Sequence, residues 1–204
     1  MKRLLVLFVL VVASVSAKAE TSVILVFGDS ISAGYGLAHV EQGWVALLQT
    51  RLKEQGYGYQ VINASVSGET TAGGVARLPR ALMLHQPKIV ILELGGNDGL
   101  RALPIAQMRA NLVHMVDLAT AAGAKVLLLG MRMPPNYGPA FTEQFSSCYS
   151  DLAHDKKLPF VPFLLNDVAL SPDLMQADGV HPNELGQPKL FANVWPALAP
   201  LLRH

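Results

Sequence analysis

The chain has 204 residues, of which 51% are hydrophobic and 15% are charged, a composition that predicts one folded domain and excludes a largely disordered chain. Its formal net charge is +1 at pH 7, so no surplus of basic residues favours binding to nucleic acid. Cys148 is the only cysteine, which excludes an internal disulfide. We expect Cys148 to be an apolar residue packed in a helix, with a nucleophile or half of an intermolecular bridge as alternatives.

The N-terminus has the pattern of a secretory signal peptide. Lys2 and Arg3 precede an apolar run over residues 4–12, and an Ala-Lys-Ala sequence ends at Ala19. This apolar run is too short for a membrane-spanning helix, which needs about 20 apolar residues. We therefore expect cleavage after Ala19, with an uncleaved anchor as the alternative. Removing this segment lowers Lys+Arg from 16 to 13 against 15 acidic residues, which gives a net charge of 13 − 15 = −2. The sequence therefore predicts a single domain over residues 20–204, exported to the periplasm without a stable membrane anchor.

Beyond the signal, short apolar runs alternate with amphipathic segments, which predicts βαβα order. The expected strands are Ser22 to Phe27, Tyr59 to Asn63, Ile89 to Leu94, Val126 to Leu129 and Pro159 to Pro162. The expected helices are Trp44 to Gln55, Thr70 to His85, Pro104 to Ala122, Tyr137 to Lys156 and Pro188 to Leu202. Strands that are apolar throughout are typical of a parallel sheet with helices on both faces. The predicted fold is α/β, a three-layer α/β/α sandwich.

Polar residues follow each predicted strand, where ligands bind in open parallel sheets. Gly28-Asp29-Ser30 follows the first strand, residues 64–69 the second and residues 95–98 the third. Residues 133–137 follow the fourth strand, and the non-periodic stretch 163–187 follows the fifth, with Asp178 and His181 near its end. One edge of the sheet is therefore expected to hold the functional residues.

Ser30 is a candidate nucleophile, which needs a base and a group that orients the base. Of the six histidines, only His181 falls in a loop at a strand edge with a carboxylate three residues away. Pro182 disfavours helical backbone at His181, and Gly179 allows a turn that brings Asp178 beside the imidazole ring. The expected catalytic residues are therefore Ser30, His181 as base and Asp178 as orienting group.

Acyl transfer also requires hydrogen-bond donors for the carbonyl oxygen. The expected oxyanion-hole and substrate-binding groups are the Ser30 N–H at a helix start, the Gly68 N–H in a loop and the Asn97 side-chain amide.

The candidate residues also have plainer structural interpretations: Ser30, Asn97 and Asp98 as helix caps, Asp178 as a turn residue and His181 as a buried histidine. Asp29 and Asp98 are interpreted as loop-ordering groups. Asp178, His181 and Glu184 as metal ligands are disfavoured, since no further His or Cys group joins them.

The chain contains four motifs in this order: "GDS" at 28 to 30, Gly68 in "SVSGET", Asn97 in "LGGNDGLR" and "DGVHPN" at 178 to 183. In order and spacing they resemble the four blocks of the SGNH, or GDSL, hydrolases. The likeness runs from about Ser22 to Leu202, and "ELGGNDGLR" with "NYG" at 136 to 138 is similar to the periplasmic thioesterase I/lysophospholipase-type branch. No catalytic position departs from the family pattern.

The resemblance implies a flavodoxin-like fold with a five-stranded parallel sheet. It also implies a serine esterase without cofactor or metal that cleaves acyl-CoA thioesters, lysophospholipids and simple esters. We expect the protein to be a monomer. The alternatives are a carbohydrate O-acetylesterase and a non-catalytic periplasmic binder of acyl lipids. Six apolar residues are candidates for an acyl channel, or else core and loop filler: Leu78, Pro79, Met131, Met133, Pro134 and Pro135.

Overall fold

Five parallel strands form one sheet in the order β2-β1-β3-β4-β5 in the computed structural model, which describes residues 22–203. The predicted signal peptide over residues 1–19 lies outside the described residues. The strands are β1 (Ser22–Gly28), β2 (Tyr59–Asn63), β3 (Ile89–Glu93), β4 (Lys125–Leu129) and β5 (Phe160–Val161).

The central strands are buried on both faces because they consist almost entirely of β-branched and aliphatic residues. All five residues of β3 are buried, and β1 is buried from Ile24 onward. The register pairs Ile24 with Ile89 and Gly28 with Glu93, so β1 and β3 end at the same edge. Loops from both strands therefore begin side by side.

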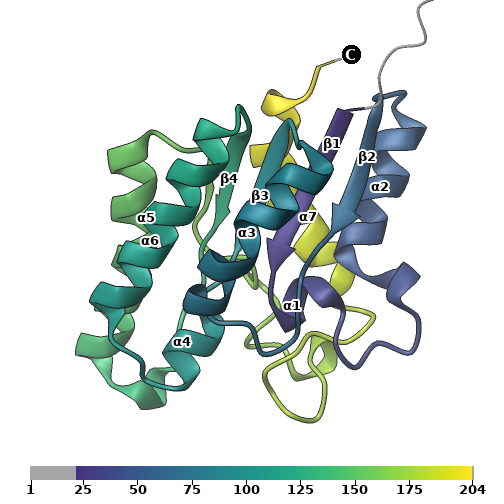
Figure 1. Cartoon of the computed structure of the whole chain (residues 1–204). Helices are drawn as coiled ribbons and strands as arrows, with labels where there is room; N and C mark the ends of the chain where they lie inside the picture. The colour runs from purple at the N-terminus through teal and green to yellow at the C-terminus, as the bar shows by residue number, and fades with distance from the viewer. Residues whose placement is uncertain (1–21, 204) are drawn as a thin grey trace, which may run out of the picture.

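The longer helices form the two outer layers. In Figure 1, α3, α5 and α6 cover one face of the sheet, and α2 and α7 lie against the other. These helices are α2 (Trp44–Glu54), α3 (Thr71–His85), α5 (Ile105–Ala121), α6 (Pro139–Lys156) and α7 (Gln187–Leu198). The predicted three-layer α/β/α architecture is confirmed.

The sequence predicts a helix start at Ser30 but no bounds for the short elements. The helices α1 (Ser30–Ala33) and α4 (Gly96–Leu100) follow β1 and β3 directly, and neither is long enough to display a hydrophobic period. The 3-10 turns η1 (Val40–Gln42), η2 (Pro135–Tyr137), η3 (Pro172–Leu174) and η4 (Ala199–Leu201) were also missed. The last helix ends at Leu198, directly before η4, and not at Leu202 as expected.

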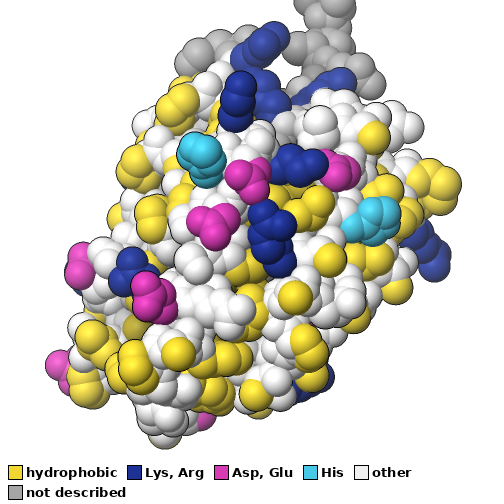
Figure 2. All heavy atoms as spheres, turned by 90° about the vertical axis from the view of Figure 1, so that its left-hand side faces the viewer, with side chains coloured by type: hydrophobic (Ala, Val, Ile, Leu, Met, Phe, Trp, Pro, Cys, Tyr) yellow, Lys and Arg dark blue, Asp and Glu magenta, His cyan; other side chains and the backbone are white. Residues whose placement is uncertain are grey.

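The face formed by α5 and α6 carries acidic and basic side chains interspersed with apolar ones (Figure 2). Two ion pairs join the helices there, Arg109 with Asp155 and Lys156 with Asp117. This face therefore presents no surface of a single charge. Over residues 22–203, no helix combines the length and apolarity needed to cross a membrane.

Cys148 lies in α6 and is buried. Burial raises the pKa of its thiol to about 11, so the thiol stays protonated at neutral pH. The expectation of a packed helical residue is confirmed, and the interpretation as a nucleophile is not supported.

Candidate active site

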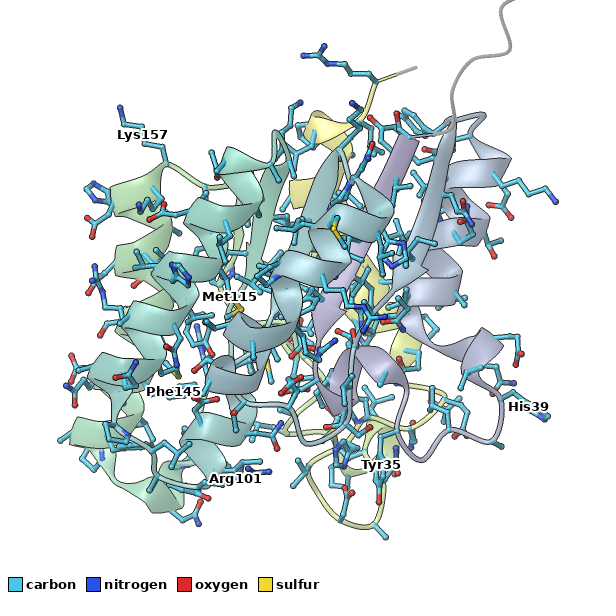
Figure 3. The ribbon with its side chains drawn as sticks, viewed as in Figure 1. Tyr35, His39, Arg101, Met115, Phe145 and Lys157 are labelled. Atoms are coloured by element: carbon cyan, nitrogen blue, oxygen red, sulfur yellow. The ribbon has the colours of Figure 1, made fainter. Side chains whose placement is uncertain are left out.

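The loops at the carboxyl edge of the sheet converge on one region. Figure 1 shows α1 beside the long loop that joins β5 to α7, at the lower edge of the molecule. Tyr35, which follows α1, and Arg101, which follows α4, lie at this same edge (Figure 3). Residues from distant parts of the chain therefore come together where parallel sheets bind ligands.

Ser30 is the first residue of α1. The side chain of Asp29 caps this helix by accepting a hydrogen bond from the Ile31 N–H at 3.0 Å, so the serine stands on a fixed turn at the end of β1. Its Oγ lies 2.9 Å from Nε2 of His181. The hydroxyl and the imidazole are thus within hydrogen-bonding distance.

Asp178 holds the imidazole from the other side. Its Oδ2 lies 2.6 Å from Nδ1 of His181, while its Oδ1 accepts the N–H groups of Val180 and His181 at 2.9 and 3.0 Å. Gly179 adopts a φ of +67° between them, which is the turn predicted from the sequence. The hydrogen bonds from the His181 backbone and ring, and then from Val180, lower the pKa of Asp178 to about 2.

An ionised Asp178 favours a proton on Nδ1 of His181, which leaves Nε2 as the acceptor that faces Ser30. The imidazole side chain is 17% exposed and that of Asp178 is 40% exposed. Tyr35 covers the ring, with ring centroids 4.7 Å apart. This arrangement can take a proton from the serine hydroxyl and return it to a leaving group.

Three donors face the same cavity as Ser30. Within the described chain, the backbone N–H groups of Ser30 and Gly68 have no hydrogen-bond acceptor. The Asn97 amide donates to Oδ2 of Asp29 at 3.1 Å, and its second N–H is left for another acceptor. Arg101 binds the Gly68 carbonyl oxygen at 3.1 Å, so the Gly68 peptide is held in place. All three predicted donors line one cavity.

The two aspartates that were interpreted as loop-ordering groups have that role in the structure. Asp29 joins α1 to Asn97, as described above. Asp98 accepts hydrogen bonds from the N–H and the hydroxyl of Thr71, at 2.9 and 2.6 Å. It thereby joins α4 to the start of α3, behind the loop that carries Gly68.

A cavity of about 610 Å³ opens next to Ser30 and His181. Its size falls in the range of small-molecule sites. The side chains that line this cavity are in large part apolar. They include Ile31, Leu100, Met131, Met133, Pro134, Pro135, Phe163, Leu165, Leu170 and Met175. An acyl chain bound at the serine would therefore meet hydrocarbon along this cavity.

Four of the six predicted channel residues, Met131, Met133, Pro134 and Pro135, line this cavity. For the other two residues the structure favours the alternative of core or loop filler. Leu78 is fully buried in the core, and Pro79 borders a separate hollow near Gln86. Both belong to α3, which packs along the face of the sheet and not at its carboxyl edge.

Sequence reasoning missed three residues that support the site: Tyr35, Gln176 and Glu93. Gln176 donates to the carbonyl oxygens of Tyr35 and Pro182, at 2.7 and 3.0 Å, and so links the loop after α1 to the loop that carries His181. Glu93 is fully buried beneath the Ser30 turn. Only its position at the end of β3 could have drawn attention to Glu93, and no motif marks Tyr35 or Gln176.

The metal-site alternative has no support in the geometry. Glu184 accepts a hydrogen bond from the Ala38 N–H at 3.2 Å, while Asp178 faces His181. Over the part of the chain that the structure describes, no three His, Cys, Asp or Glu side chains are grouped to hold a metal ion.

Comparison with known proteins gives consistent results. Residues 26–188 match the GDSL-like Lipase/Acylhydrolase family. The chain is 52% identical over 202 residues to Esterase TesA of Pseudomonas aeruginosa, covering 99% of this chain and 100% of that protein. It is 42% identical over 200 residues to the Thioesterase 1/protease 1/lysophospholipase L1 of Escherichia coli strain K12, covering 97% and 92%.

Solved structures agree with these sequence relatives. A crystal structure of TesA superposes with a TM-score of 0.87 at 54% identity, covering 89% of this chain and 100% of that chain. The psychrotrophic esterase EstA from Pseudoalteromonas sp., in a structure inhibited by monoethylphosphonate, gives 0.83 at 38% identity, covering 88% and 97%.

Proposed function

The chain belongs to the GDSL-like lipase/acylhydrolase family, and we propose that it cleaves acyl esters and thioesters through an acyl enzyme formed on Ser30. Family membership makes it an esterase-type hydrolase. The proposal assigns the steps to residues. The observation that carries it is the chain of contacts from Ser30 through His181 to Asp178.

In the first half-reaction, Nε2 of His181 takes the Ser30 proton as Oγ attacks the acyl carbonyl carbon. The resulting oxyanion accepts hydrogen bonds from the N–H groups of Ser30 and Gly68 and from the Asn97 amide. The tetrahedral intermediate then collapses with cleavage of its bond to the leaving oxygen or sulfur atom. The imidazolium, stabilised by Asp178, protonates that atom, so that an alcohol or a thiol departs and the acyl group stays on Ser30. A water molecule repeats the sequence on the acyl enzyme, which releases the carboxylic acid and restores Ser30.

The cavity supports a substrate with a hydrocarbon acyl chain. Its lining holds Ser30 and His181 together with apolar side chains, among them Leu170, which is 91% exposed. The relatives named as thioesterase, arylesterase and lysophospholipase support acyl thioesters, aryl esters and lysophospholipids as the substrate classes. A carbohydrate deacetylase would have little use for an apolar cavity of this volume.

The test of the nucleophile is Ser30→Ala, compared with Ser150→Ala, which changes an exposed serine of α6. Removing the nucleophile of a triad costs up to about 10⁶-fold in kcat, so Ser30→Ala is expected to lose p-nitrophenyl octanoate hydrolysis and labelling by a fluorophosphonate. Ser150→Ala keeps both. Turnover retained by Ser30→Ala, with the same circular dichroism spectrum, contradicts the proposal.

Acyl length tests the substrate class. We expect kcat/KM to increase from acetyl to octanoyl esters, since each buried CH₂ contributes about 0.8 kcal/mol of transfer free energy. A constant kcat/KM along this series would instead support the deacetylase.

We also propose that the enzyme is exported to the periplasm. The charged and apolar pattern of residues 2–19 supports this localisation. N-terminal sequencing of the periplasmic fraction from expressing cells is expected to begin at Glu20, and an intact Met1 would contradict it.

A further inference from the structure

We propose that Glu93, at the carboxyl end of β3, is a positioning residue whose carboxyl group holds the turn that carries Ser30. This inference rests on the proposed role of Ser30 as nucleophile. Glu93 touches neither the cavity nor Ser30 Oγ, so it acts through the backbone and side chains around the nucleophile.

Glu93 contacts the chain on both sides of the nucleophile. Its Oε2 accepts a hydrogen bond from the Asp29 N–H at 3.2 Å and another from the Ser32 hydroxyl at 2.6 Å. Asp29 directly precedes Ser30, and Ser32 follows it by two residues. A single oxygen atom from β3 thus joins the end of β1 to the first turn of α1.

The space around this carboxyl group accounts for the glycine before Asp29. Gly28 is paired with Glu93 in the sheet, and a Cβ at residue 28 would lie 2.5 Å from Oε2 and 2.9 Å from the Glu93 carbonyl oxygen. A larger residue at position 28 would therefore displace the carboxyl group. Gly28, the first residue of the Gly-Asp-Ser motif, therefore leaves the space that the Glu93 carboxyl group occupies.

Burial is the main reason that the pKa of Glu93 is raised well above its ordinary value, and the nearby Asp29 carboxyl adds to it. The Ser32 hydroxyl and the backbone N–H groups of Asp29 and Ser32 lower the pKa, and so oppose this shift. Oε1 of Glu93 is buried and has no partner among residues 22–203. A neutral carboxyl group suits this site, because a carboxylate buried without a cation is costly.

The contacts of Glu93 extend to the proposed oxyanion hole. Asp29, whose N–H is bound by Glu93, accepts the Asn97 amide at 3.1 Å through its own carboxyl group. Displacement of Asp29 would therefore move both the nucleophile and one proposed donor. Since Glu93 does not line the cavity, a loss of Glu93 should reduce kcat and leave KM nearly unchanged.

Glu93→Gln and Glu93→Met test this role. Gln keeps an oxygen that can accept both hydrogen bonds, while Met fills a similar volume without such an acceptor. We expect Glu93→Gln to keep kcat within about tenfold of the wild type. We expect Glu93→Met to lose about 10²-fold in kcat and in the rate of fluorophosphonate labelling, the size of effect that a misplacement of about 1 Å produces.

Leu127→Ala is the control for loss of stability. Leu127 is a fully buried residue of β4, so its truncation is expected to lower the Tm and leave kcat unchanged when the protein is folded. All variants are assayed well below their own Tm. If Glu93→Met does not fold, Ser32→Ala replaces it, because this change removes the 2.6 Å hydrogen bond and is expected to lower kcat about tenfold at constant KM.

Wild-type kcat in Glu93→Met, or in Ser32→Ala where that variant replaces it, would overturn the positioning role. An equal loss of kcat in the Gln and Met variants would also overturn it, because restoring the acceptor would then have no effect. Either result would leave the proposed function intact if Ser30→Ala is inactive. Turnover by Ser30→Ala would instead remove the nucleophile on which this inference rests.

Discussion

Ser30 and His181 are 151 residues apart in the chain, yet Oγ and Nε2 lie 2.9 Å from one another. The reactivity proposed for the serine depends on this contact, because a serine hydroxyl is a weak nucleophile without a base. The Asp178 carboxylate holds the other ring nitrogen at 2.6 Å. The chemistry of the site thus belongs to three side chains acting together.

Asp178→Asn is expected to lower kcat strongly while the fold is kept. An asparagine amide that donates to Nδ1 would favour the tautomer with its proton on Nε2, which cannot accept the Ser30 proton; the corresponding change in a serine protease lowers kcat about 10⁴-fold. Steady-state hydrolysis of p-nitrophenyl octanoate measures the effect.

Asp173→Asn provides the control, since Asp173 lies in η3 of the same loop and its side chain is not part of the site. We expect this variant to keep wild-type kcat. Activity of Asp178→Asn equal to that of Asp173→Asn would rule out the orienting role.

At the scale of elements, two loops meet through Gln176. Its side chain donates to the Tyr35 and Pro182 carbonyl oxygens, and its N–H donates to the His181 carbonyl oxygen at 2.8 Å. The loop after α1 is thereby joined to the loop before α7. This contact explains how His181, in a segment with little regular structure, keeps its place above Ser30.

Gln176→Ala is expected to lower the free energy of unfolding by about 1–3 kcal/mol, because two hydrogen bonds with a net value of about 0.5–1.5 kcal/mol each are lost. It should also reduce kcat, since the two loops can then separate. Urea denaturation and ester hydrolysis measure the two effects.

Gln144→Ala on the exposed surface of α6 is the matched change for this experiment and should have little effect on either quantity. If Gln176→Ala behaved in the same way, the contact between the loops would have no role in holding His181.

At the scale of the whole molecule, the sheet buries acidic groups beneath the site. Burial raises the pKa of Asp29 to about 6, against the opposing hydrogen bond from the Ile31 N–H. The pKa of Asp178, which is held by hydrogen bonds at the rim, moves in the opposite direction. The fold therefore separates a carboxylate that is ionised even in acid from carboxyl groups that keep their protons to higher pH than usual.

The raised pKa of Asp29 predicts a dependence of stability on pH. An unfolded aspartate titrates near pH 4, so between about pH 4 and 6 the folded protein holds a proton that the unfolded chain has released. The stability contributed by this proton is complete below pH 4 and is lost as the pH rises to about 6, by about 3 kcal/mol.

Urea denaturation of the wild type and of Asp29→Asn, from pH 4 to 7, measures this effect as the difference between the two proteins. Asparagine also caps helices and does not titrate. Stability curves that run parallel across this range would show that Asp29 titrates normally.

The strands and the long helices could be identified from the amino-acid sequence alone. Runs such as Ile24 to Phe27 and Ile89 to Leu92 are apolar throughout and short, and only a sheet covered on both faces buries such segments. Parallel order then put Ser30, Gly68, Asn97 and His181 at one edge, because the carboxyl ends of parallel strands lie together. These inferences needed only local pattern and topology.

The distances within the site and the groups that support it follow from the packing of the folded chain. The 2.9 Å contact of Ser30 with His181, the burial of Glu93 and the link through Gln176 arise between segments that are far apart in the chain. For the same reason the sequence left open whether Leu78 lines the cavity or the core, since an apolar residue of α3 suits both equally well by its chemistry. Side-chain type is a local property, whereas a neighbour across the fold is set by the packing of the whole chain.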